Sequence, residues 1–205
     1  METLTLHHPF TGIVCGPTGC GKTRFCFRLV KYREDIIEPS PQRIVWCYGI
    51  YQEAFKDLRN VEFQEGMPDV SQFDKRHRTL LVIDDLMTEV SDKTTELFTR
   101  GSHHMNISIL FLTQNLFAGN KQNRTISLNT HYFCIFKNPR DRTQIGVLAR
   151  QMFPTNWRYM MEASADATEK PYSYLFVDLK PETEDRYRLR SGIFLDEPNY
   201  FYVPR

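Results

Sequence analysis

Short apolar runs alternate along the chain with segments whose apolar residues recur every three or four positions. The continuous apolar runs predict buried strands at residues 11–15, 43–48, 79–83, 107–112 and 132–136, with a further short strand at 61–64. Helical spacing predicts helices at residues 22–32, 51–58, 91–100, 142–152 and 156–163. Two final strands, at residues 172–179 and 187–194, could pair as a hairpin across residues 181–185. This order is typical of an α/β fold in which helices cover both faces of a mainly parallel sheet.

The length of 205 residues suits one such domain and is too short for two comfortable ones. We expect a single domain over residues 1–205, with a core at about 9–165 and a small C-terminal β extension at about 170–205. No apolar stretch approaches the ~20 residues of a membrane span, and the N-terminus lacks a signal-peptide pattern. We therefore expect a soluble intracellular protein with no membrane partner.

Hydrophobic residues make up 41% of the chain and charged residues 25%, which excludes a disordered chain. The net charge of +1 is distributed unevenly. Residues 121–158 contain seven Lys or Arg and one acidic residue, so this segment carries +6 and the remainder −5. A solvated basic face and a phosphate-facing surface explain this segment equally well.

A glycine-rich loop at residues 16–23, GPTGCGKT, follows the first predicted strand and precedes the first predicted helix. We call it the phosphate loop. It fits the pattern G-x-x-x-x-G-K-[ST], whose backbone N–H groups cradle phosphates. We expect Lys22 to reach the β- and γ-phosphates of ATP, and the Thr23 hydroxyl to ligate Mg²⁺. The predicted nucleotide-binding residues are Gly16, Pro17, Thr18, Gly19, Cys20, Gly21, Lys22 and Thr23.

Two acidic residues follow the apolar strand at residues 79–83. A carboxylate at the C-terminal tip of a parallel strand lies in the crevice where such sheets bind ligands. We assign Asp84 to the Mg²⁺ site and Asp85 to orienting or deprotonating the attacking water. Many ATPases have glutamate at the second position, and aspartate is one methylene shorter.

A polar residue, Gln114, ends the next predicted strand and is a candidate sensor of the γ-phosphate or of the attacking water. Arg100 ends the preceding helix and is a candidate arginine finger, which stabilises transition-state charge on a neighbouring subunit's nucleotide. Arg140 and Arg142, in NPRDR, are rival candidates that the sequence does not separate from Arg100.

Five blocks carry a family resemblance: GIVCGPTGCGKT, RIVWCYG, LLVIDDL, RGSHHMNISILFLTQN and HYFCIFKNPRDRTQIGVLARQMFP. They resemble the DNA-packaging ATPases of Polinton/Maverick elements and adintovirus-like genomes. Those enzymes are similar in turn to the poxvirus packaging ATPase of the HerA/FtsK superfamily. The resemblance extends from about residue 9 to about residue 195.

The resemblance implies a three-layer P-loop NTPase of the RecA-like ASCE type, in which Gln114 is the sensor. It also implies a homo-oligomeric ring, hexameric or pentameric, around double-stranded DNA, with an arginine acting in trans. Such a ring would use ATP to drive DNA into a capsid, so a capsid or portal protein is a further expected partner. The expected location is the host cytoplasm or nucleus, with virion association during assembly.

Three other functions stay open on the sequence alone. A small-molecule or nucleotide kinase shares the phosphate loop and a similar size. A DNA helicase or transposition-helper ATPase belongs to the same broad class. A non-catalytic nucleotide-binding scaffold would follow if Asp85 impaired hydrolysis.

Overall fold

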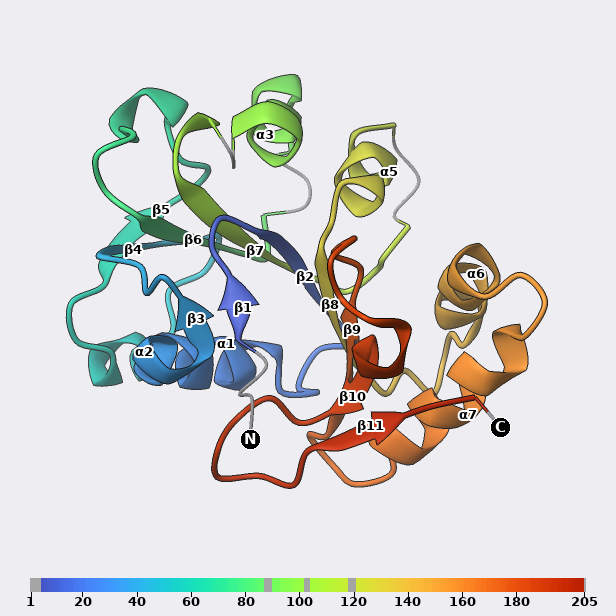
Figure 1. Cartoon of the computed structure of the whole chain (residues 1–205). Coiled ribbons are helices and arrows are strands. Elements are labelled where there is room, and N and C mark those ends of the chain that lie inside the picture. Colours follow the sequence, from blue (N-terminus) through green and yellow to red (C-terminus); the bar gives the residue numbers. More distant parts are fainter. Residues whose placement is uncertain (1–4, 87–89, 102–103, 118–120, 205) are drawn as a thin grey trace.

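The computed structural model describes residues 5–86, 90–101, 104–117 and 121–204. Within these ranges, the centre is a nine-stranded sheet with the order β11-β10-β9-β8-β2-β7-β6-β4-β5 (Figure 1). Its strands are β2 (Thr11–Cys15), β4 (Arg43–Tyr48), β5 (Glu62–Glu65), β6 (Thr79–Asp84), β7 (Ile107–Thr113), β8 (Tyr132–Phe136), β9 (Tyr174–Asp178), β10 (Leu189–Ser191) and β11 (Tyr200–Tyr202). The strands from β8 to β5 run parallel, and β9, β10 and β11 extend the sheet antiparallel. The predicted α/β class, mainly parallel sheet and C-terminal β addition are confirmed.

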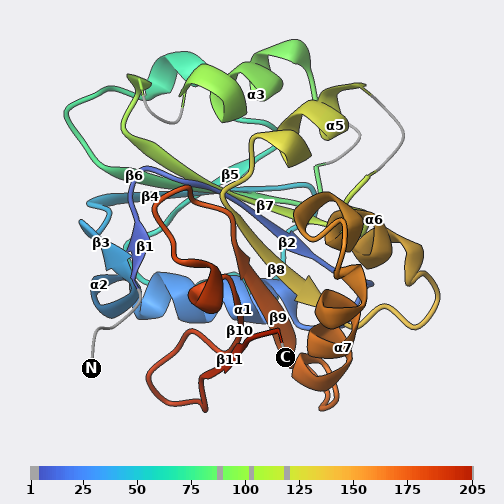
Figure 2. The ribbon, with the colours of Figure 1, turned by 45° about the vertical axis from the view of Figure 1, so that its right-hand side comes forward.

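Helices cover both faces of this sheet (Figure 2). One face carries α1 (Lys22–Lys31) and α2 (Arg33–Ile36), and the other carries α3 (Asp92–Glu96) and α5 (Lys121–Leu128). The last helices, α6 (Thr143–Met152) and α7 (Trp157–Ala167), pack on the α3 side. Two hydrophobic cores result, one between the sheet and each helical layer.

Strand β6 shows how the apolar runs produce this three-layer arrangement. All six of its residues are buried, because both faces of a central parallel strand meet a core. Leu81 and Ile83 enter the core on the α3 side, while Leu80 and Val82 enter the core on the α1 side. The continuous apolar run therefore reflects burial on both faces.

Helix α1 packs through one apolar stripe. Its buried residues are Phe25, Cys26, Leu29 and Val30, which share one face at helical spacing. They contact the sheet face that contains Trp46. This packing fixes the position of the N-terminal end of α1, where the phosphate loop ends.

The register brings the carboxyl ends of the central strands to one edge. Cys15 at the end of β2 pairs with Thr113 of β7, and Asp84 at the end of β6 pairs with Leu112. Strand β7 therefore lies between the strand before the phosphate loop and the strand that carries the acidic pair. The sequence resemblance implies such an additional strand for an ASCE-type fold, and β7 occupies that position.

The predicted helix over residues 91–100 is wrong as one continuous α-helix. It consists of α3 followed by a π-helical turn, Leu97–Gly101. Leu97 and Phe98 of that turn are buried in the core, so packing of these two side chains accompanies the local change of helical pitch.

The second C-terminal strand is also shorter than predicted. A 3-10 turn, Asp185–Tyr187, precedes β10, and Gly192 ends it with φ 78°. A Cβ at Gly192 would lie 2.4 Å from the Pro198 carbonyl oxygen, so the chain folds back closely there. The prediction of an antiparallel β9–β10 pair is confirmed.

Several short elements were not predicted. Helix α5 buries one apolar side chain, Ile126, beside Asn123 and Ser127, so it lacks an apolar stripe. Strand β11 is three residues long, and β1 (Leu6–His7) and β3 (Ile37–Glu38) form a separate two-residue pair. None of the described helices is long and apolar enough to cross a membrane.

Candidate nucleotide site

The phosphate loop connects β2 to α1 at the carboxyl edge of the sheet. The Gly16 amide donates to the Thr113 carbonyl oxygen at 3.2 Å, which ties the loop to β7. A Cβ at Gly16 would lie 2.6 Å from the Cys20 sulfur and 2.8 Å from Phe136 Cβ. Only glycine therefore fits at the start of this loop.

The end of the loop needs glycine for a different reason. Gly19 has φ 77° and Gly21 has φ 113°, values that other residues adopt only with strain. Gly21 is the N-cap of α1, which has no side-chain cap and no acidic residue in its first turn. The N–H groups and the positive end of the helix dipole are thus free of a competing carboxylate and suit an anion.

Lys22 folds back over this loop. Its ammonium donates to the carbonyl oxygens of Gly16 at 2.7 Å and of Pro17 at 3.0 Å. These contacts hold the charge close to the loop's concave side. The lysine is in place to meet an anion bound by the loop amides.

Asp84 is a buried carboxylate at the end of β6. It is 5% exposed, and its Oδ2 atom has no hydrogen-bond partner. Desolvation and then the nearby charge of Asp85 raise the pKa of Asp84 to about 6, against the attraction of Lys22. The Trp46 indole N–H lies near Asp84 and lowers its pKa, although the indole N–H and Asp84 Oδ2 are not in hydrogen-bonding geometry.

Asp85 is exposed and has φ 58°, in the left-handed region that aspartate tolerates better than most residues. Consecutive residues of a strand point to opposite faces of a sheet. Here the strand ends between the two acids, and both side chains line the same cavity. The left-handed turn at Asp85 therefore allows two adjacent carboxylates to serve one site.

That cavity, which we call the phosphate cavity, has a volume of 420 Å³ and opens between the phosphate loop and the ends of β6 and β7. It is lined by Thr18, Gly19, Gly21, Lys22, Thr23, Arg24, Gln52, Asp84, Asp85, Leu112, Gln114 and Tyr172. The predicted lysine, threonine, both acids and the glutamine are thus together in the structure. Pro17 contributes its carbonyl to Lys22, while Gly16 and Cys20 line neighbouring cavities.

The residues present suit a magnesium ion with a nucleotide. The unpartnered buried oxygen of Asp84 and the Thr23 hydroxyl line one space, and Mg²⁺ prefers oxygen ligands. No group of three or more His, Cys, Asp or Glu that could hold a metal occurs among the described residues. Mg²⁺ in phosphate sites typically uses one or two protein oxygens together with phosphate and water.

Sequence reasoning missed Gln52, Arg24 and Tyr172. Gln52 follows β4, whose carboxyl end lies at the same edge, so its position after a parallel strand was an available signal. Arg24 directly follows the motif. Tyr172 gave no local signal, because it comes from the segment between α7 and β9.

Two of the candidate arginine fingers, Arg140 and Arg142, do not line the chain's own phosphate cavity. The backbone of Arg100 belongs to the π-helical turn Leu97–Gly101, and its side chain lies outside the described part of the structure. Arg140 and Arg142 are exposed in the loop after β8. Among the described arginines, only Arg24 lines the phosphate cavity.

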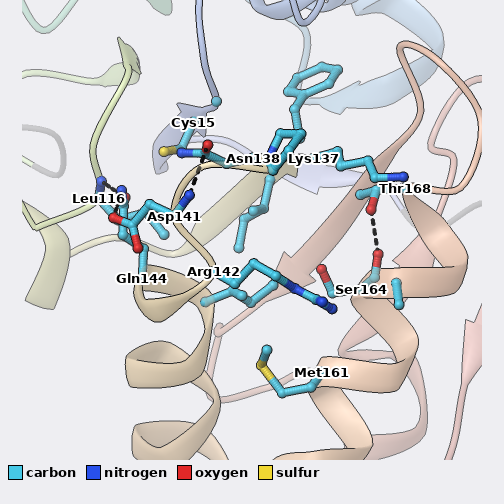
Figure 3. A pocket seen from close by; sticks show the side chains of 16 residues that line it. Cys15, Leu116, Lys137, Asn138, Asp141, Arg142, Gln144, Met161, Ser164 and Thr168 are labelled. Carbon is cyan, nitrogen blue, oxygen red and sulfur yellow. Dashed lines mark hydrogen bonds between the residues drawn. The ribbon is translucent and has the colours of Figure 1, made fainter.

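Arg142 instead borders a second cavity of 370 Å³, between the loop after β8, α6 and α7 (Figure 3). Its side chain points toward Ser164 of α7 in this view. At the opposite wall, Gln144 donates to Asp141 at 2.8 Å and accepts from the Leu116 amide at 2.7 Å. These bonds join α6 to the segment that follows Gln114.

Solved structures of other proteins share this architecture. No family model and no curated protein matches the chain. The solved DNA-packaging ATPase B204 of Sulfolobus turreted icosahedral virus aligns with a TM-score of 0.59 and 11% identity, over 98% of this chain and 100% of that chain. The chain shares the B204 fold.

Two further solved structures agree. The genome packaging NTPase B204 of Sulfolobus turreted icosahedral virus 2, in complex with ATP-gammaS, aligns with a TM-score of 0.59 and 12% identity, over 96% of this chain and 98% of that chain. The same protein in complex with AMP aligns with a TM-score of 0.52 and 12% identity, over 85% and 95%. In two of these three structures the likeness spans nearly the whole chain.

Proposed function

We propose that this chain is a magnesium-dependent ATPase that acts as a DNA-packaging motor subunit, translocating double-stranded viral or transposon DNA into a capsid. One observation carries the proposal: a single cavity brings together the GPTGCGKT loop, the acidic pair and Gln114. The fold shared with B204 over nearly the whole chain supports the packaging role. The finer kinship with Polinton/Maverick, adintovirus-like and poxvirus packaging ATPases rests on the sequence blocks.

The residues divide the work of hydrolysis. The loop amides and Lys22 bind the β- and γ-phosphates, and Thr23 and Asp84 hold Mg²⁺. When bound, Mg²⁺ neutralises charge that develops on the phosphate oxygens. Asp85, exposed to solvent at the cavity wall, orients the attacking water and accepts its proton. Gln114 contacts the γ-phosphate or the attacking water. Release of the γ-phosphate changes this contact, and the change passes to Leu116, whose amide donates to Gln144.

The motor works as a homo-oligomeric ring, a hexamer or pentamer, around double-stranded DNA. The Arg140 and Arg142 side chains lie away from their own phosphate cavity, which supports action on a neighbour's nucleotide; Arg100 stays the third candidate. A capsid or portal protein receives the DNA, and the protein acts in the host cytoplasm or nucleus and associates with virions during assembly.

ATP hydrolysis with and without long double-stranded DNA tests the proposal, comparing wild type with Lys22→Ala and Asp85→Asn. We expect DNA to accelerate ATP turnover by the wild type. Both variants should lose turnover, because Lys22 anchors the phosphates and Asp85 activates the water. Asp85→Asn should still bind ATP. Phosphate transfer to a nucleoside, indifferent to DNA, would instead identify a kinase, and tight ATP binding without turnover would identify a scaffold.

A further inference from the structure

Tyr172 combines an unfavourable backbone conformation with an exposed ring. Four described residues other than glycine have a positive φ, and three of them are Asn or Asp, which tolerate this region. Tyr172, with φ 65°, is the fourth, and an aromatic residue in this region is strained. The residue is 61% exposed, so burial does not account for the strain.

The fold places this residue beside the phosphate loop, although about 150 positions separate them in the sequence. A Cβ built on Gly21 would lie 3.4 Å from Tyr172 Cδ1 and 3.6 Å from Tyr172 Cβ. Tyr172 follows Pro171 in the turn between α7 and β9. The ring therefore lies next to Gly21, the N-cap of α1.

Tyr172 lines several cavities, and one of them is the phosphate cavity. The phosphate cavity shares three lining residues, Gly21, Arg24 and Tyr172, with a smaller cavity of 260 Å³. The smaller cavity is not lined by Asp84, Asp85 or Gln114. A ligand whose terminal phosphate faces those residues can reach the smaller cavity with its opposite end, past the residues that line both cavities.

Four of the eight residues that line the smaller cavity are aromatic, and two are arginines, Arg24 and Arg28. Phe25 and Tyr174 pack edge to face with ring centroids 4.9 Å apart, and Phe136 and Tyr174 lie 5.7 Å apart. These rings stabilise one another, whereas no ring or guanidinium packs on Tyr172 among the described residues. Arg24, exposed in the first turn of α1, adds a cation to the same wall.

We infer that Tyr172 stacks on the nucleoside base of the bound nucleotide and that the 260 Å³ cavity is the base-binding site. This inference rests on the proposed function, because it assumes a nucleotide whose phosphates occupy the loop. A flat base fits an unpartnered tyrosine ring, and a guanidinium can cover the base from another side. The left-handed backbone conformation at Tyr172 places the ring at this position.

The test compares binding of Mg-ATP and of magnesium tripolyphosphate, which has no base, by titration calorimetry. Tyr172→Gly removes the ring and suits φ 65°, so its unfolding midpoint without ligand should equal or exceed that of wild type. We expect this variant to bind ATP about tenfold to a hundredfold more weakly and tripolyphosphate unchanged. Tyr172→Phe should restore ATP binding.

Tyr200→Ala is the matched control. Tyr200 is 62% exposed and lines a larger cavity of 550 Å³ between the end of α7 and the C-terminal strands, which Tyr172 also borders. Loss of ATP affinity in Tyr200→Ala but not in Tyr172→Gly would place the base there and overturn the inference. Equal losses for ATP and tripolyphosphate in Tyr172→Gly would also overturn it.

Because the readout is binding, the two proposals can fail separately. A wild type that binds ATP more tightly than tripolyphosphate through Tyr172, yet shows no hydrolysis, would contradict the proposed function and support the base site. A wild type that binds the two ligands equally would contradict the base site alone. A wild type that binds neither ligand would overturn both.

Discussion

Replacing Asp84 by asparagine should stabilise the ligand-free protein at neutral pH while removing its activity. The carboxyl of Asp84 is buried, and its pKa rises from an ordinary value of 3.8 to about 6. Its charged form is therefore disfavoured in the folded protein. Asparagine has nearly the same shape and carries no charge, so it resembles the protonated acid.

The size of the effect follows from the pKa shift. Each unit corresponds to about 1.4 kcal/mol, so a shift of about two units gives ~3 kcal/mol at most. A group whose folded pKa is raised contributes stability below its unfolded pKa and loses that contribution as pH rises through the folded pKa. The contribution of Asp84 is thus fully present below about pH 3.8 and lost above about pH 6.

Urea unfolding of wild type and Asp84→Asn at pH 4 and at pH 7.5 measures this directly. We expect nearly equal unfolding free energies at pH 4 and a more stable variant, by up to ~3 kcal/mol, at pH 7.5. A variant that is less stable at pH 7.5, or a difference independent of pH, would refute the reasoning. The same variant should bind Mg-ATP weakly, because the amide replaces an anionic ligand of Mg²⁺.

Three further variants test other parts of the site. Lys22→Ala should lower turnover, measured by phosphate release, at least about a hundredfold. The unfolding free energy should change by less than about 1 kcal/mol, because water can replace the hydrogen bonds from Lys22 to the loop carbonyls. Gly16→Ala should destabilise the protein by about 1–3 kcal/mol, since its Cβ meets Phe136 at 2.8 Å; Gly19→Ala, whose Cβ meets nothing within 4 Å, should cost only about 1 kcal/mol for its φ in the same urea assay. Gln144→Ala leaves the Leu116 amide without its partner, so kcat should fall more than KM changes; equal changes in both would contradict a positioning role for Gln144.

The central sheet was predictable because its strands have a simple physical signature. A strand buried on both faces has a continuous apolar run, as β6 has, and the acidic pair at its end marks the carboxyl edge. The phosphate loop was equally predictable from the sequence, because the positive φ angles at Gly19 and Gly21 require glycine. Local chemistry determines both features.

Other features depend on contacts that the sequence does not display. Helix α5 packs through Ile126 and two small polar residues, so no apolar period reveals it. Tyr172 reaches the loop because β9 lies next to β8, which lies next to β2, the strand that precedes the loop. An exposed tyrosine gains significance from its φ of 65° and its proximity to Gly21, which are properties of the folded chain.

Displacement of a third strand from duplex DNA tests the central claim most directly. A motor that moves along double-stranded DNA should strip a triplex-forming oligonucleotide in an ATP-dependent way, without separating the duplex strands. The account predicts displacement by wild type and none by Asp85→Asn. ATP hydrolysis without displacement, or separation of a forked duplex instead, would contradict a double-stranded DNA translocase.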